Sequence, residues 1–164
     1  MRLAIIGCKG RKEPNPCSAR DMYMPSPLHK AQISFVEAYY DAYIILSAKY
    51  EVMFPTDFIE PYSMMVVQNK SRFVVYSPNT IVMTLPERKI WAQNICKHEV
   101  FTREWDEIHF HTPMLYNQYF KKYKQPHWKY VKFPEFHDKV SNVQRYKNRY
   151  QSVLDGNEPE IDFI

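Results

Sequence analysis

Two short polar segments, each directly after an apolar run, hold residues whose chemistry suits an anionic ligand. Segment 7–12 (GCKGRK) follows the run 3–6 and combines two glycines with three cations. Glycines allow a turn that exposes backbone amides, and such a turn beside positive charge can form a phosphate-binding nest. Segment 47–50 (SAKY) follows the run 43–46, and its serine and lysine could bind a phosphate or carboxylate. Both segments are equally typical of solvated surface loops.

Two residues are candidates for catalytic chemistry. Lys49, beside Tyr50, could act in acid–base catalysis. Glu60 lies on an irregular, proline-rich stretch before Pro61 and Tyr62. A carboxylate in a cleft can be a general base or a nucleophile at a sugar carbon, although a surface role is more common for a glutamate.

Metal binding and the common dinucleotide loops are not expected. His109 and His111 are two residues apart in an alternating stretch, so both would lie on one face of a strand. A zinc site needs three or four protein ligands, and no third ligand has a supporting spacing. The chain has only three glycines, which excludes a Gly-rich dinucleotide fingerprint or a Walker loop. We expect no metal and no cofactor.

The last third of the chain interleaves cations with aromatic rings. Single-stranded nucleic-acid binders use this combination, with cations along the backbone and rings on the bases. The candidates for such a role are Arg145, Lys147 and Arg149. An amphipathic helix with aromatic core residues and solvated cations shows the same stripe, and this alternative stays open.

The elements that must position these residues follow from apolar periodicity and from residues that begin helices. Expected strands cover residues 3–6, 43–46, 106–111 and 128–133. Expected helices begin at Ser26-Pro27, Thr84, Pro113 and Asp138, and end near residues 40, 98, 123 and 154. Strands that alternate with helices predict an α/β domain of three layers, with a mostly parallel sheet of about four strands. In such a sheet ligands bind beyond the carboxyl ends of the strands, where segments 7–12 and 47–50 would lie.

A single domain over residues 1–154 is expected, with a small insertion at about residues 64–84 and a loose acidic tail at residues 155–164. A chain of 164 residues with 45% hydrophobic and 24% charged residues is typical of a globular protein with one core. The insertion could form a hairpin around Asn69-Lys70. The tail contains four acidic residues and no basic ones.

Charge and cysteine content bear on partners and location. Residues 1–154 hold 22 positive and 14 negative charges, a net charge of +8, which favours phosphate-bearing partners. Three cysteines without a CxxC pair indicate reduced thiols rather than a disulfide scaffold. No apolar stretch is long enough for a signal peptide or a membrane span, so we expect a cytoplasmic protein without membrane contact.

Four segments occur in a suggestive order: 7–9 (GCK), 17–23 (CSARDMY), 45–50 (ILSAKY) and 60–62 (EPY). In these segments the chain resembles a family of small bacterial and bacteriophage proteins often labelled peroxide-stress YaaA-like. Where that family usually has a glycine after the third segment, this chain has Glu51. The resemblance covers residues 3–62 well and 106–135 loosely. It implies a Rossmann-like fold, similar to nucleoside deoxyribosyltransferases, with a pocket at the strand ends.

The residues and the resemblance together predict an enzyme that processes nucleotides, nucleosides or nucleic-acid bases at a glycosidic bond, in phage-type DNA or nucleotide metabolism. The expected phosphate ligands are Lys9, Lys12 and Arg20, with Cys8 and Asp21 in the same pocket. Ser47 and Lys49 would orient the substrate, Glu60 would be nucleophile or base, and Tyr23, Tyr50 and Tyr62 would stack on the base. Two alternatives remain: a non-catalytic phage-type protein that binds a small nucleotide signal, host nucleic acid or a host protein, and a nucleic-acid module using the C-terminal cations.

Overall fold

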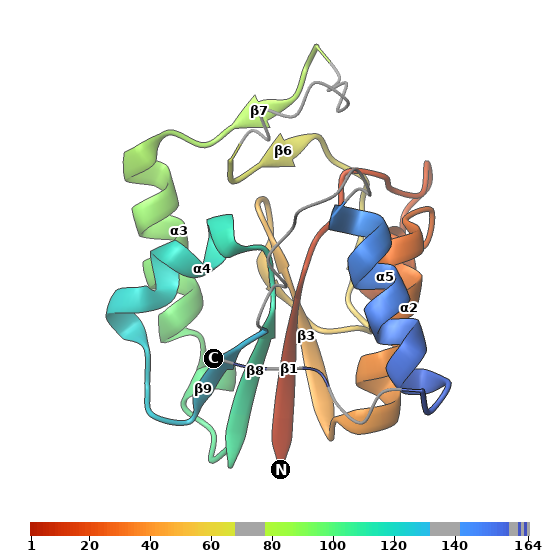
Figure 1. Ribbon diagram of the computed structural model, residues 1–164. Helices are drawn as coiled ribbons and strands as arrows, with labels where there is room; N and C mark the ends of the chain where they lie inside the picture. The colour runs from red at the N-terminus through yellow and green to blue at the C-terminus, as the bar shows by residue number, and fades with distance from the viewer. Residues whose placement is uncertain (68–77, 132–141, 158–160, 162, 164) are drawn as a thin grey trace.

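The computed structural model describes residues 1–67, 78–131, 142–157, 161 and 163. Its centre is a five-stranded sheet in the order β4-β3-β1-β8-β9 (Figure 1). Four strands are parallel: β1 (Arg2–Gly7), β3 (Ala42–Ser47), β8 (Glu107–His111) and β9 (Trp128–Tyr130). They correspond to the four stretches expected from the sequence, and the prediction of an α/β chain with a mostly parallel sheet is confirmed.

The fifth strand was missed by the sequence analysis, which expected irregular structure after Tyr50. β4 (Glu51–Met53) turns back antiparallel to β3, so that Ser47 pairs with Glu51. The turn requires Glu51 to adopt a φ of +60°. A left-handed conformation is uncommon for a residue with a Cβ, so local propensity gave no signal for this strand.

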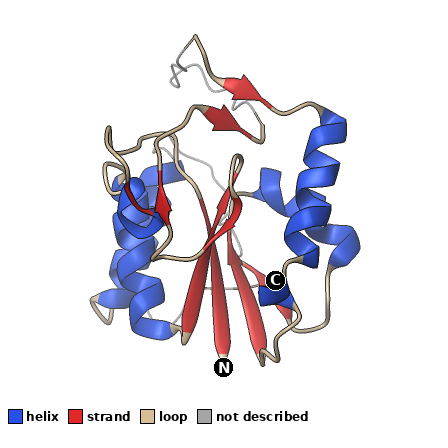
Figure 2. Cartoon of the chain, turned by 180° about the vertical axis from the view of Figure 1, so that it is seen from behind, coloured by secondary structure: helices blue, strands red, loops and turns tan. Residues whose placement is uncertain are grey.

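Helices cover both faces of the sheet (Figures 1 and 2). On one face lie α2 (Pro27–Tyr39) and α5 (Asn142–Leu154), which pack against each other, and on the other lie α3 (Leu85–Lys97) and α4 (Met114–Phe120). The helix starts expected at Ser26 and Thr84 are confirmed. Ser26 Oγ accepts from the His29 amide at 3.4 Å, and Thr84 forms a reciprocal capping box with Glu87. The expected cap at Asp138 lies outside the described residues.

The central strands are buried on both sides, which explains their unbroken apolar runs. Alternate residues of β1 enter different cores: Ala4 and Ile6 face α2 and α5, and Leu3 and Ile5 face α3 and α4. β8 alternates in the same way, with His109 and His111 toward α2 and Ile108 and Phe110 toward α3. The two histidines therefore share one face, as their spacing predicted.

Small elements lie around the sheet. α1 (Ala19–Met22) follows β2 (Cys17–Ser18), which pairs antiparallel with β5 (Phe58–Ile59). β6 (Met64–Met65) pairs in parallel with β7 (Ile81–Val82), and this pair lies beyond the carboxyl ends of the central strands (Figure 1). Short 3-10 turns occupy Glu99–Phe101 and Lys121–Tyr123. The centre of the hairpin expected at Asn69-Lys70 lies outside the described residues.

Part of the C-terminal segment packs against the domain. Ile161 is buried in the core between the sheet and α2, and Phe163 forms an antiparallel bridge with Val131. The Phe163 ring centroid lies 4.1 Å from that of His109. The expectation of a loose tail was therefore wrong at these two positions, because the apolar residues between the acidic ones supply packing contacts. None of the helices among the described residues combines the length and apolar character needed to cross a bilayer.

Candidate functional site

The direction of the strand order reverses at β1. The chain crosses from β1 through α2 to β3 on one side, and β8 later joins β1 on its other side. In open α/β sheets such a reversal creates a crevice at the carboxyl ends of the strands. Gly7 ends β1 there, and a Cβ at this position would meet Pro113 and Tyr116 at 3.4 and 3.5 Å. These are ordinary van der Waals distances, so the loop after β8 lies directly against the end of β1.

A chain of hydroxyl groups runs from the end of β3, through Tyr62, to Tyr23 at the end of α1. Ser47 Oγ donates to Tyr62 Oη at 2.7 Å, and Tyr62 Oη lies 2.7 Å from Tyr23 Oη. Burial raises the pKa of both tyrosines well above the ordinary value, so both stay protonated. Ser47 also accepts from the amides of Lys49 and Tyr50 at 3.1 and 3.0 Å. Because its oxygen is fully engaged, Ser47 shapes the turn into β4 rather than contacting a ligand directly.

Two lysines of segment 7–12 are partly buried at this end of the sheet. Lys12 Nζ is 4.4 Å from the centroid of the Tyr62 ring and 5.8 Å from that of Tyr23. Lys9 Nζ donates to the Gly7 carbonyl. Burial lowers the pKa of Lys12 and lowers that of Lys9 to about 8. In the described residues, neither lysine has a carboxylate within 4 Å, so their charges are not neutralised by an ion pair.

Cys8 lies between this cluster and the loop after β8. Its amide donates to the Leu46 carbonyl at 2.8 Å, which ties the segment to β3, and its Sγ lies 3.6 Å from Tyr116 Oη. Burial raises the pKa of Tyr116, and the nearby Cys8 thiol contributes. The Tyr116 ring packs edge-on against Trp91, whose Nε1 donates to the Ser47 carbonyl at 2.9 Å. Sequence analysis missed both Tyr116 and Trp91, because their contacts with Cys8 and Ser47 span more than 40 residues.

Lys49, Tyr50 and Glu60 lie at the rim. Tyr50 packs edge-on against Tyr62 with 5.5 Å between ring centroids, and Lys49 Nζ is 4.9 Å from the Tyr50 ring. Tyr50 Oη donates to the backbone carbonyl of Glu60 at 3.4 Å. The side chains of Lys49 and Glu60 are exposed to solvent. Of Ser47, Lys49 and Glu60, which were expected to orient or attack the substrate, none therefore combines a position inside the cluster with a free functional group.

Arg20 and Asp21 do not join the cluster. The Arg20 guanidinium forms two hydrogen bonds with the Glu37 carboxylate on α2, at 2.7 and 3.0 Å, and a third with Asp21 at 2.9 Å. Tyr43 Oη also donates to Glu37 at 3.0 Å. Arg20 thus fastens α1 to α2, where the sequence predicted a phosphate ligand. Arg20 and Asp21 are therefore joined to each other in an ion pair as well as to α2.

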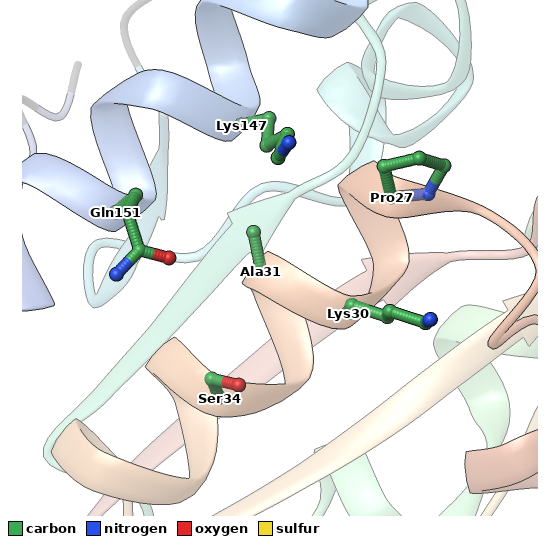
Figure 3. A pocket seen from close by; sticks show the side chains of 6 residues that line it. All are labelled: Pro27, Lys30, Ala31, Ser34, Lys147 and Gln151. Carbon is green, nitrogen blue, oxygen red and sulfur yellow. The ribbon is translucent and has the colours of Figure 1, made fainter.

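The strand-end site is defined from here on as Cys8, Lys9, Lys12, Tyr23, Ser47, Tyr50, Tyr62 and Tyr116. A separate hollow of about 320 Å³ lies between α2 and α5, away from these residues. Pro27, Lys30, Ala31, Ser34, Lys147 and Gln151 line it (Figure 3). Arg145 and Arg149 are half-buried on the same helix as Lys147, and Tyr150 is buried. An amphipathic helix with aromatic core residues therefore explains the burial of Tyr150 on α5. Lys147, on the same helix, borders a surface hollow.

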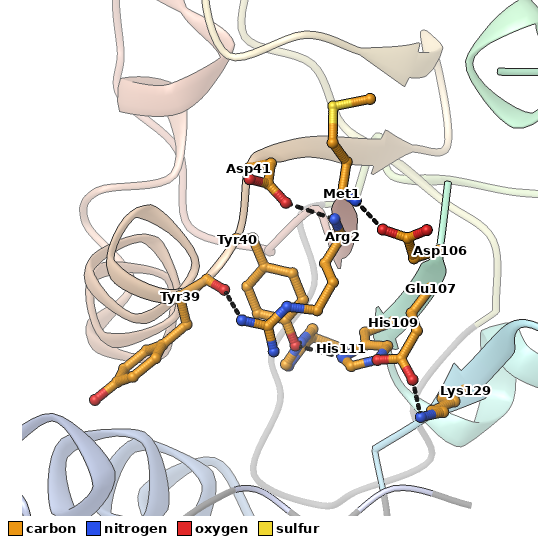
Figure 4. Close-up of polar contacts among 10 residues, drawn as sticks. All are labelled: Met1, Arg2, Tyr39, Tyr40, Asp41, Asp106, Glu107, His109, His111 and Lys129. Atoms are coloured by element: carbon orange, nitrogen blue, oxygen red, sulfur yellow. Dashed lines mark hydrogen bonds and ion pairs between the residues drawn. The ribbon is translucent and has the colours of Figure 1, made fainter. Parts of the chain in front are cut away.

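A second polar cluster lies on the α2 face of β8. Tyr40 Oη lies 2.7 Å from His109 Nδ1 and 2.8 Å from His111 Nε2 (Figure 4). His109 Nε2 lies 2.8 Å from Glu107, and His111 Nδ1 lies 2.9 Å from Tyr150 Oη. Burial lowers the pKa of both histidines. No group of three or more metal-ligating side chains occurs among the residues that the structure describes.

Comparison with known proteins gives one match. No curated protein and no solved structure matches the chain. The family described as DUF6884, a family of unknown function, matches residues 3–142. That range includes every residue of the central sheet except Arg2, and every residue of the strand-end site. The chain therefore belongs to the DUF6884 family.

Proposed function

We propose that this protein binds a nucleotide or phosphorylated nucleoside at the strand-end site. The observation that carries the proposal is the pair Lys9 and Lys12, partly buried and without a carboxylate partner in the described residues. A desolvated charge without a counter-charge is costly, and a bound anion would remove that cost. Phosphate suits a glycine-containing loop flanked by lysines at a strand end.

The tyrosines favour a nucleotide over a simple phosphate. Tyr50 and Tyr62 form an edge-on aromatic pair at the rim, with Lys49 and Lys12 near their rings. Aromatic side chains beside cations stack on bases while the cations pair with phosphate. A Rossmann-like arrangement, with its ligand at the strand-order reversal, is part of this proposal, as is the resemblance to nucleoside-processing folds.

Chemistry at the glycosidic bond is a second candidate function. The contact between Tyr50 Oη and the Glu60 carbonyl holds the Glu60 backbone at the rim of the same site. An exposed carboxylate there could attack the anomeric carbon of a bound nucleotide, displace the base, and release the sugar when water cleaves the glycosyl ester. Binding without turnover, as in a protein that captures a nucleotide signal, needs only the lysines and tyrosines.

Calorimetric titration tests binding. The four common ribonucleoside 5′-monophosphates, the matching nucleosides and inorganic phosphate are titrated into the protein at pH 7. We expect at least one monophosphate to bind, and Lys12→Met to weaken it about tenfold or more, which corresponds to about 1.4 kcal/mol. Lys30→Met, which removes an exposed lysine on α2, is the matched control and leaves the affinity unchanged. Failure of all four monophosphates to bind, or equal binding by Lys12→Met, would overturn the proposal.

Release of free base separates the two candidates. Chromatography of the bound nucleotide after incubation shows turnover or its absence. If base appears, Glu60→Gln is expected to abolish its release without changing the dissociation constant. If no base appears, the protein is a binder and Glu60 has no catalytic role.

A further inference from the structure

Two buried hydrogen-bond acceptors near the strand-end site have no donor among the residues that the structure describes. His29 is fully buried on α2, and its Nε2 lies 2.8 Å from the Arg20 carbonyl. A carbonyl oxygen only accepts, so the proton is assigned to Nε2 and Nδ1 is a bare lone pair. Burial, with the charge of Lys9, lowers the pKa of His29 to about 4, so the ring is neutral. Within the described part of the chain, Nδ1 has no hydrogen-bond partner.

Gln32 supplies the second acceptor. It lies three residues after His29, on the same side of α2, and is 4% exposed. Its Nε2 donates to the His111 carbonyl at 3.1 Å and to Tyr150 Oη at 3.3 Å. The bond to a carbonyl decides the orientation of the amide, so the unpartnered atom is the oxygen Oε1. Buried acceptors are rarely left without a donor in native proteins, so each of the two needs an explanation.

The strand-end site connects with these acceptors through Lys9 and Tyr23. Lys9 Nζ donates to the carbonyl of Gly7, next to Ile6 at the end of β1, and Ile6 pairs with His111, whose carbonyl accepts from Gln32. The hydrogen bond to Gly7 uses one of the three N–H donors of Lys9. The Tyr23 ring packs edge-on against His29 at 5.4 Å, and Tyr23 Oη contacts Tyr62 Oη. The Tyr23 side chain therefore contacts the His29 ring on one side and the hydroxyl groups of the strand-end site on the other.

We propose that His29 Nδ1 and Gln32 Oε1, together with Lys9, form a subsite for the sugar hydroxyl groups of the bound ligand. This inference rests on the proposed function and narrows its ligand to a ribonucleotide. A sugar hydroxyl donates to a bare acceptor and accepts from an ammonium, so it suits this combination. A phosphate oxygen only accepts and is repelled by two lone pairs, which directs the phosphate toward Lys12 instead.

The test compares sugars on the unaltered protein. Each ribonucleoside 5′-monophosphate and its 2′,3′-dideoxy counterpart are titrated calorimetrically under the same conditions. A site built around a ligand hydroxyl rejects the analogue that lacks it, so we expect the dideoxy compound to bind about tenfold more weakly or worse. Equal affinity for the two sugars would overturn the subsite and leave the proposed nucleotide binding standing. If neither compound binds, the proposed function fails and the subsite falls with it.

A substitution at one of the two acceptors tests the role of His29 directly. In His29→Gln the side-chain amide can still donate to the Arg20 carbonyl, but the Nδ1 acceptor is lost. We expect this variant to lose the preference for ribose while its affinity for the dideoxy compound stays unchanged. Lys12→Met is expected to weaken both compounds by the same factor, because it acts on the phosphate. Ser34→Ala, at an exposed position on α2, is the control for altering that helix. A ribose preference that survives in folded His29→Gln would overturn the role of His29.

Discussion

The two polar clusters of this molecule differ in how completely their hydrogen bonds are made. In the histidine cluster of β8, a carboxylate at one end decides the direction of every bond (Figure 4). Glu107 only accepts, so His109 donates to it from Nε2 and accepts at Nδ1 from Tyr40. Tyr40 in turn accepts from His111 Nε2, and His111 Nδ1 accepts from Tyr150. Both rings are satisfied as neutral groups.

In and near the strand-end site, by contrast, several polar groups have no ion-pair or hydrogen-bond partner among the described residues. Lys9 and Lys12 have no carboxylate partner among the described residues, and the nearby acceptors of His29 and Gln32 have no donor. Fully paired polar networks make a core rigid and specific, whereas unpaired buried groups cost stability. The paired groups of the histidine cluster stabilise the fold, whereas the unpaired groups of the strand-end site are the ones on which the proposal of ligand binding rests.

Acidification should produce the largest loss of stability. Burial lowers the pKa of His29 to about 4 and that of His111 to about 3, while an unfolded histidine titrates near pH 6.5. Below pH 6.5 the unfolded chain therefore binds protons that the folded chain excludes. Stability should fall as the pH drops from 6.5 toward 4, by about 1.4 kcal/mol per pH unit for each histidine. Urea unfolding between pH 7 and pH 5 measures how the free energy of unfolding changes with pH. In His29→Gln this change should be smaller by the contribution of one histidine, about 1.4 kcal/mol per pH unit. A free energy of unfolding that stays constant over this pH range would contradict the burial of His29 and His111 in their neutral forms.

Tyr40→Phe should break the histidine cluster and leave the strand-end site intact. The substitution removes one hydroxyl and leaves a donor of His111 and an acceptor of His109 unpaired. The expected loss is about 3 kcal/mol in the free energy of unfolding, measured in urea. Tyr39→Phe is the matched control, because the neighbouring hydroxyl makes only a 3.5 Å contact with the Val153 carbonyl. Nucleotide affinity should not change in either variant. A loss of affinity in Tyr40→Phe would mean that the two clusters act together.

Lys9→Met should change stability in the opposite direction from Tyr40→Phe and stabilise the protein. It removes a partly buried cation that burial disfavours, with the folded-state pKa lowered to about 8. At pH 7 the charged form is present in both states and is less favourable in the folded one, so the substitution should stabilise the protein by about 1 kcal/mol. Nucleotide affinity should fall about tenfold in the same variant. A destabilised Lys9→Met would show that this lysine is structural, like the histidine cluster.

Glu51→Gly should give the smallest effect, at the turn that frames the strand-end site. Glu51 has a φ of +60°, which costs a residue with a Cβ more than glycine. The loss of the exposed hydrogen bond from Asn94 to Glu51 offsets part of the gain. We expect a net stabilisation of about 0.5 kcal/mol in urea unfolding. Glu51→Ala loses the hydrogen bond and keeps the strain, so it should show no gain. Equal free energies of unfolding for Glu51→Gly and Glu51→Ala would contradict backbone strain at Glu51.

Local signals in the sequence were sufficient for most of the framework. Short apolar runs predicted β1 and β3, because a strand buried on both faces is apolar throughout, and alternation of apolar and polar residues predicted β8. Ser26 with Pro27, and Thr84 with Glu87, predicted helix starts because capping depends on residues three or four positions apart. The strand-end position of Cys8, Lys9, Lys12 and Ser47 followed from those elements.

The partners of the site residues depended on distant parts of the chain. Arg20 was expected to hold phosphate, but folding brings the Glu37 carboxylate to it from α2. Glu60 remains exposed, and Tyr62 meets Ser47 and Tyr23 only because the stretch after β4 returns across the strand ends. No spacing rule relates residues whose contact is decided by a loop conformation.

The sequence by itself therefore determined the layers of this protein and the edge of the sheet at which its cations lie. Only the tertiary structure decided which polar groups are paired. His109 and His111 are paired completely, whereas Lys9 and Lys12 have no counter-charge in the described segments of the chain. The physical reason is that burial and periodicity are local properties of a segment. Hydrogen-bond satisfaction depends on atoms that come together only after the chain has folded.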